Sequence, residues 1–188
     1  MGGAETVFAL LAVMWAVELV NSVDHDDLSN DYGIVPRQLD GLRGVVLSPF
    51  LHVSWAHLIG NSVPFAVLGL MIAFAGSRRV IAVTVIVALV AGIGTWLSSP
   101  SNSDTVGASG VVFGYAAYLV TRGFFNRRIA ELAVGVIVAA LFGGALLVSL
   151  VPHAGISWED HVFGALGGVL AARSLRLRDR VQPARALT

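Results

Sequence analysis

The sequence predicts an all-α, polytopic membrane protein with a six-transmembrane-helix bundle, and three observations predict it. Hydrophobic residues make up 56% of the 188 positions and charged residues only 13%, about half the charged fraction of an average soluble domain. Six apolar stretches approach the roughly 20 residues that a helix needs to cross a bilayer. Finally, the arginines of the connecting segments fall almost entirely on one side of a six-span arrangement.

We place the six helices in one domain, residues 1–188, at about 6–23, 55–75, 79–97, 107–125, 129–150 and 159–175. The second, third and fifth are dense in Val, Ala, Leu and Ile. The fourth and sixth are richer in Gly and begin with polar residues, which suits helices that are shielded from lipid by other helices. The connection 24–54 contains Pro36, Pro49, Gly33 and Gly41, so we interpret it as an irregular loop and not as a seventh span.

The arginine distribution predicts the orientation. Ten of the twelve basic residues lie in the 2–3 connection, the 4–5 connection and the C-terminal tail: Arg78, Arg79, Arg122, Arg127, Arg128, Arg173, Arg176, Arg178, Arg180 and Arg185. The opposite loops carry most of the acidic residues, among which we count Asp104, Glu159 and Asp160. Because cytoplasmic loops are enriched in arginine and lysine, we expect a multi-pass protein of the cell membrane with both termini in the cytoplasm.

Composition also excludes several kinds of site. The chain has no Cys, which rules out thiolate catalysis, disulfides and Cys-ligated metals. A net charge of zero offers no basic excess to neutralise phosphates. We therefore expect no cofactor and no nucleic-acid partner, whereas membrane lipid and other membrane proteins are the natural partners. The sequence does not specify an oligomeric state.

Polar side chains that lie within the predicted spans are the candidates for function, because such groups are costly in lipid. His57 and Asn61 are four residues apart and share one face of the second helix. Ser109 lies 13 residues before Arg122, and His161 lies 12 before Arg173. At about 1.5 Å per residue, both sit roughly 18–20 Å from the cytoplasmic arginines, at one depth near the outer surface.

Two Gly-x-x-x-Gly patterns predict how these residues come together. The fourth helix contains Gly110 and Gly114, and the sixth contains Gly164 and Gly168. Paired small residues let two helix backbones approach closely in a membrane. Since His161 lies on the glycine face of its helix, this approach would bring it close to the serine.

These residue types match one chemistry. A serine hydroxyl becomes a nucleophile when an imidazole takes its proton, and Ser109 with His161 would suffice if packing held the imidazole in place. The oxyanion that forms on attack needs preorganised donors. His57, Asn61 and the Ser109 backbone N–H could supply them.

Three motifs in these segments resemble the rhomboid family of intramembrane serine proteases. They are Gly107-Ala108-Ser109-Gly110, His161-x-x-Gly164-x-x-x-Gly168 and His52-x4-His57-x3-Asn61. The resemblance implies a serine endopeptidase that cleaves peptide bonds in or next to transmembrane segments, with Ser109 and His161 as the catalytic pair and His57 and Asn61 at the oxyanion. His52 and the four glycines Gly107, Gly110, Gly164 and Gly168 would be supporting residues.

The chain departs from the family pattern at three places, one of which is a glutamate, common near the end of the second helix, that is missing around Ala75-Gly76-Ser77. Leu42-Arg43 stands where many members have a Trp-Arg pair, and Phe113 stands where many have Tyr. Two other functions remain open: a non-proteolytic relative that binds client helices, and a haem or metal protein that uses His52, His57 and His161.

Overall fold

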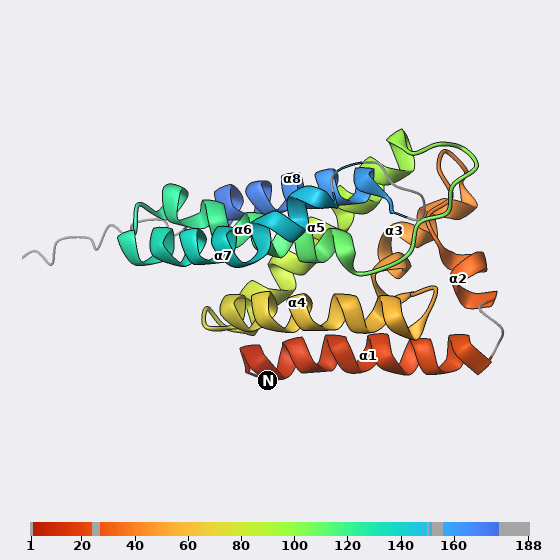
Figure 1. Ribbon diagram of the computed structural model, residues 1–188, viewed down its shortest axis with the longest axis horizontal. Helices are drawn as coiled ribbons and strands as arrows, with labels where there is room; N and C mark the ends of the chain where they lie inside the picture. Colours follow the sequence, from red (N-terminus) through yellow and green to blue (C-terminus); the bar gives the residue numbers. More distant parts are fainter. Residues whose placement is uncertain (1, 24–26, 150, 152–155, 177–188) are drawn as a thin grey trace, which may run out of the picture.

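The computed structural model describes residues 2–23, 27–149, 151 and 156–176, and within these ranges six long helices dominate the fold (Figure 1). They are α1 (Gly3–Val23), α4 (Trp55–Ala73), α5 (Ser77–Ser98), α6 (Ser109–Asn126), α7 (Ile129–Val148) and α8 (Trp158–Ser174). Each one coincides with a predicted stretch, with ends that differ by only a few residues. The prediction of an all-α membrane bundle is confirmed. His25, His153 and the tail arginines Arg178, Arg180 and Arg185 lie outside the described residues.

Four of the long helices, α1, α4, α5 and α7, are long and apolar enough to cross a membrane. The first turn of α8 carries Glu159 and Asp160 and its last turn carries Arg173, which lowers its mean hydropathy. α6 packs against α4, α5, α7 and α8, and most of its side chains are buried. Protein therefore surrounds α6 as we expected for the fourth segment, and it need not be apolar on every face.

The outer side chains of α7 are apolar, as a lipid-facing surface requires. Val136, Leu141 and Leu147 are each more than 60% exposed. In water such a continuous apolar surface would promote aggregation, but in a bilayer it contacts acyl chains.

Short helical turns fill the connection between α1 and α4, and none of them spans a membrane. They are α2 (Asp27–Tyr32), η1 (Asp40–Arg43), α3 (Gly44–Leu47) and η2 (Ser48–Phe50). The interpretation of 24–54 as a loop is therefore confirmed over its described residues. Arg43 donates to the Asp31 carbonyl oxygen at 3.0 Å and lies over the Tyr32 ring, so the arginine of the altered Leu42-Arg43 pair anchors within the loop.

The same loop is attached to the connection between α5 and α6. Ile34 and Thr105 exchange two backbone hydrogen bonds, of 2.9 and 3.2 Å. Arg37 donates to the carbonyl oxygens of Leu97 and Ser99. These contacts tie the segment before α4 to the segment that leads into α6.

α4, α6 and α8 begin at the same end of the bundle, together with the α1–α4 loop, at the right of Figure 1. The described arginines of the other connections gather at the opposite end. There Arg79 donates to the Leu175 carbonyl oxygen, and Arg122 forms an ion pair of 3.0 Å with Glu131. The starts of the three helices that carry the polar candidates are thus brought together.

The two glycine pairs form the contact between α6 and α8. A Cβ atom added at Gly164 would overlap with the carbonyl oxygen of Gly110, and one added at Gly168 would overlap with that of Gly114. Backbone therefore lies directly against backbone, and the close approach predicted from the Gly-x-x-x-Gly patterns is confirmed.

Replacement of Gly164 by Ala should lower the free energy of unfolding by about 1–3 kcal/mol, the usual cost of overpacking, because the new methyl group meets a backbone oxygen that cannot move aside alone. Gly143→Ala on α7 is the matched control: no atom lies within 4 Å of its Cβ position, so the change should stay within about 1 kcal/mol. Unfolding of both variants in detergent measures the difference. Equal stabilities would contradict the backbone contact.

Candidate active site

Ser109 is the first residue of α6, and the turn before it needs glycine. Gly107 has φ of +122°, a region that side-chain-bearing residues rarely adopt. Its N–H donates to the Ser48 carbonyl oxygen at 2.9 Å. The next N–H, of Ala108, donates to Nε2 of His52 at 3.4 Å. The loop that precedes α4 therefore holds the entry into α6.

The imidazole of His161 is held by packing and by one carbonyl group. Its ring stacks on Phe113, one turn after Ser109, with centroids 4.1 Å apart and planes 4° from parallel. Its Nδ1 lies 2.8 Å from the Ser149 carbonyl oxygen. A carbonyl oxygen can only accept, so Nδ1 carries the proton and Nε2 is left free to accept one. No carboxylate is needed to orient this ring.

Ser109 and His161 lie in the first turns of two helices that touch along their glycine faces. Within the described residues, however, the structure shows no direct hydrogen bond between them. The Ser109 hydroxyl instead donates to Oδ2 of Asp160 at 3.5 Å, a long and weak bond. The first turns of the two helices thus lie side by side, and the hydroxyl bonds to the residue next to His161.

Asp160 is the functional candidate that the sequence interpretation missed. We counted it with the acidic residues of the outer loops, but it lies in the first turn of α8 and its side chain is only 6% exposed. One signal could have found it. It directly precedes His161 within the predicted span 159–175, and a carboxylate within a span is a functional candidate by default.

His57 and Asn61 point from α4 toward the turn before Ser109. A Cβ atom at Gly107 would lie 2.7 Å from Cε1 of His57 and 3.6 Å from Nδ2 of Asn61, so the missing side chain makes room for both. Nδ2 of Asn61 and Nδ1 of His57 are buried without a hydrogen-bond partner among the described residues. Buried polar groups nearly always have partners. The unpaired amide is therefore suited to an acceptor on a bound molecule.

His52 connects these groups to the loop. Its side chain is fully buried, and its ring meets that of His57 edge-on at 5.0 Å. Its carbonyl oxygen accepts from Nδ2 of Asn21 at 3.0 Å and from the Ser29 hydroxyl at 2.8 Å. Burial, with a smaller effect of the neighbouring His57, lowers the pKa of His52 to about 4. The neutral ring can then accept the Ala108 N–H, which gives His52 a supporting position.

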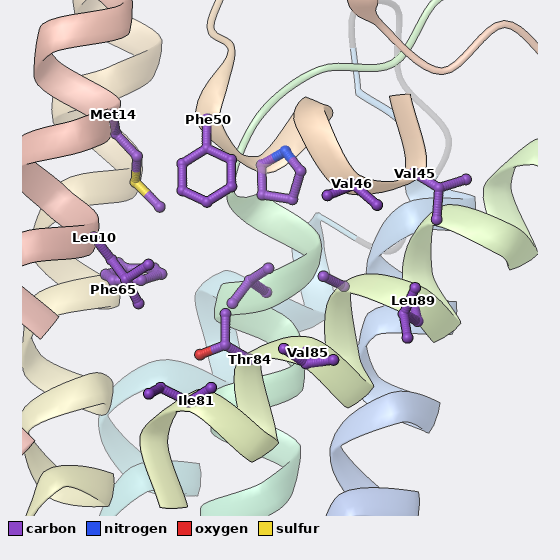
Figure 2. A pocket seen from close by; sticks show the side chains of 13 residues that line it. Leu10, Met14, Val45, Val46, Phe50, Phe65, Ile81, Thr84, Val85 and Leu89 are labelled. Atoms are coloured by element: carbon purple, nitrogen blue, oxygen red, sulfur yellow. The ribbon is translucent and has the colours of Figure 1, made fainter. Parts of the chain in front are cut away.

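Other features of the described residues do not suggest a second reaction site. No group of three or more His, Cys, Asp or Glu side chains among them could hold a metal ion. An apolar cavity of about 240 Å³ lies between α1, the α3–η2 segment and α5 (Figure 2). Met14, Phe50 and Leu89 line it, and none of the candidate site residues does.

The chain is similar to known proteins along most of its length. A model of the Rhomboid domain matches residues 40–178. An uncharacterized protein of Mycobacterium tuberculosis is 38% identical over 98% of this chain and 79% of its own length. One of Mycobacterium leprae is 38% identical over 96% of this chain and 74% of its own length. YdcA of Bacillus subtilis, named provisionally as a rhomboid protease, is 31% identical over 87% of this chain and 83% of its own length.

The low pKa of His52 predicts a loss of stability in mild acid. Its pKa falls from 6.5 to about 4 on folding, so between these values the unfolded chain binds more protons. Stability should therefore fall as the pH drops through this window, by at most about 3 kcal/mol. His52→Gln removes the titrating group. Its unfolding free energy, measured in detergent from pH 7.5 to 4, should fall less steeply than that of the wild type; parallel curves would contradict the buried neutral ring.

Proposed function

Because this chain belongs to the rhomboid family, we propose that it is an intramembrane serine endopeptidase with Ser109 as nucleophile and His161 as general base. The observation that carries the proposal is the state of His161: its Nδ1 is bound to the Ser149 carbonyl oxygen and its ring is stacked on Phe113. An imidazole held in this way, with Nε2 free, at the start of a helix that packs against the helix of Ser109 is equipped to activate that serine.

The reaction would proceed in two halves. The Ser109 hydroxyl turns from Asp160 to His161, gives its proton to Nε2, and Oγ attacks the carbonyl carbon of the substrate. The tetrahedral intermediate collapses, and His161 gives the proton to the leaving amine. The acyl part of the substrate then remains bound to Ser109 as an ester. A water molecule, activated by His161 in the same way, then hydrolyses this ester and restores the serine.

The oxyanion of each tetrahedral intermediate would accept hydrogen bonds from Asn61, His57 and the Ser109 backbone N–H. The buried and unpaired Nδ2 of Asn61 supports this assignment. A donor that has no other partner does not have to break a hydrogen bond or reorient when the negative charge forms. Such preorganisation is the physical basis of oxyanion stabilisation.

The substrates would be membrane proteins cleaved within or next to a transmembrane helix. A helix engages its own carbonyl groups in hydrogen bonds, so the scissile segment must be locally unwound before Ser109 can attack. We place all six long helices across the cell membrane in one domain of residues 1–188, with both termini in the cytoplasm and the active site opening to the outer side. The described arginines of the α4–α5 and α6–α7 connections and of the end of α8 lie at one end of the bundle, which supports this orientation.

Ser109→Ala should reduce cleavage of a model transmembrane substrate below about a thousandth of the wild-type rate, the scale expected when a nucleophile is removed. His161→Ala should abolish both cleavage and labelling of the serine by a fluorophosphonate probe, because the unassisted hydroxyl is a weak nucleophile. Ser103→Ala, in the exposed loop before α6, serves as the control and should behave as the wild type.

Substantial activity in the Ser109 variant would refute the nucleophile. A wild-type protein that is folded but neither cleaves nor labels would refute the protease and favour the binding of client helices.

The orientation can be tested separately, because the chain contains no cysteine. A single cysteine in place of Ser103 should react with a membrane-impermeant thiol reagent on intact cells, whereas one in place of Ser77 should be protected. The arginines beside Ser77, Arg78 and Arg79, should hold that end of α5 in the cytoplasm. The reverse pattern would mean that the site opens to the cytoplasm, and labelling of both positions would contradict the span between them.

A further inference from the structure

A buried carboxylate lies between the two helices that carry the proposed catalytic pair. Asp160 is 6% exposed and precedes His161 on α8. A charged group at such a position is costly unless it has partners that stabilise it. The reaction proposed above does not use it, so its presence needs another reason.

The carboxylate occupies the space that a side chain at position 110 would fill. A Cβ atom at Gly110 would lie 2.6 Å from both Cγ and Oδ1 of Asp160, and closer still to Oδ2. Gly110 therefore has two roles in the packing: its carbonyl oxygen lies against Gly164, and its bare Cα receives Asp160. The first turn of α6 is thus in contact with α8 at successive levels.

The start of α6 also lacks a cap of its own. The residue before the helix is Ala108, whose side chain offers no hydrogen bond, and the first N–H groups of a helix have no partner within it. The Asp160 carboxylate lies at this helix start: Oδ2 accepts from the Ser109 hydroxyl at 3.5 Å, and the carboxylate lies against the bare Cα of Gly110. A negative charge at this end also complements the helix dipole. Asp160 therefore brings a carboxylate from a neighbouring helix to a helix start that has no side-chain cap.

We propose that Asp160 is a positioning residue, whose carboxylate holds the first turn of α6 against α8 and thereby sets the place of Ser109 relative to His161. This inference rests on the proposed function, since it concerns the same pair of residues. Asp160 and His161 are consecutive, so any shift of α6 away from the carboxylate is also a shift of the serine away from its base. The carboxylate is in addition the resting partner of the Ser109 hydroxyl.

The placement also limits which groups can stabilise the oxyanion. The Asp160 carboxylate fills the space beside the bare Cα of Gly110, so a substrate cannot occupy that side of the helix start. The Ser109 N–H, Asn61 and His57 remain, which are the donors assigned above. Oxyanion stabilisation should therefore depend on the α4 side chains more than it would if a substrate could approach all the N–H groups at the start of α6.

Asp160 could instead stabilise only its own helix, because its N–H donates to the Ser157 hydroxyl oxygen at 3.4 Å and acidic residues favour a helix start. Glu159 distinguishes the two roles. It carries the same charge in the same turn and is equally buried, but no contact with Ser109 or Gly110 is found for it among the described residues. Glu159→Gln is therefore the matched control.

The experiment compares Asp160→Ala, Asp160→Asn and Glu159→Gln in the full chain in detergent, with kcat, KM and the rate of fluorophosphonate labelling as readouts. Asp160→Ala should lower kcat and labelling together by about tenfold to a hundredfold, the effect of a slight misplacement of reacting groups, with KM near that of the wild type. Asp160→Asn should recover to within about threefold, because its side chain has nearly the same size and its amide oxygen can still accept from the Ser109 hydroxyl. Glu159→Gln should match the wild type.

Hydrogen–deuterium exchange adds a readout that does not depend on activity. Exchange in the peptide that contains residues 108–112 should increase in Asp160→Ala and remain unchanged in Glu159→Gln. If Asp160→Ala does not fold, Gly110→Ala takes its place, because the new methyl group displaces the carboxylate and should lower kcat by a similar factor.

Wild-type kcat and labelling in Asp160→Ala, or in Gly110→Ala when that variant is used, would overturn the inference. So would an Asp160→Asn variant as impaired as Asp160→Ala, or equal losses of kcat in Asp160→Ala and Glu159→Gln. A wild-type protein without any cleavage or labelling would refute the proposed function instead. The exchange comparison would then still decide whether Asp160 holds the start of α6.

Discussion

The backbone contact between α6 and α8 is the constraint on which the arrangement of the site depends. Gly164 and Gly168 lie against the carbonyl oxygens of Gly110 and Gly114, at a distance that no side chain would permit. In lipid, where there is little hydrophobic driving force between helices, such packing is a main source of association. The same contact brings together the first turns of both helices, and these turns carry Ser109, Asp160 and His161.

At this end of the bundle, hydrogen bonds connect His52 to three other segments. The carbonyl oxygen of His52 accepts two hydrogen bonds from α1 and α2, and its ring accepts the Ala108 N–H. Among the described residues, Nδ2 of Asn61 and Nδ1 of His57 are buried and have no hydrogen-bond partner. Because they lie beside the turn that leads into Ser109, they are suited to an acceptor or donor on a bound ligand.

The reaction proposed for Ser109 and His161 needs no carboxylate to orient the imidazole. A stacked ring and a carbonyl oxygen together fix its plane and its tautomer. Phe113 provides the same stacking surface as a tyrosine would, so the loss of a hydroxyl at this position leaves the imidazole oriented. Asp160, although next in the chain, directs its carboxylate to the start of α6 and not to the ring nitrogen that Ser149 occupies.

The sequence by itself determined where the helices lie along the chain and predicted one common depth for Ser109 and His161 in the membrane. The lengths of the apolar stretches, the arginines at alternate connections and the spacing of Ser109 and His161 from them depend only on local order along the chain, because a helix rises by a constant amount per residue. The glycine spacing even predicted which faces meet.

Only the tertiary structure decided what each polar side chain touches. The unpaired amide of Asn61, the bond from His161 to Ser149 and the burial of Asp160 all depend on contacts between segments far apart in the chain, which local spacing does not encode. Asp160 shows this best. An aspartate at the start of a helix suits an exposed helix end by propensity, and only the bare Cα of Gly110 on a different helix provides the space that buries it.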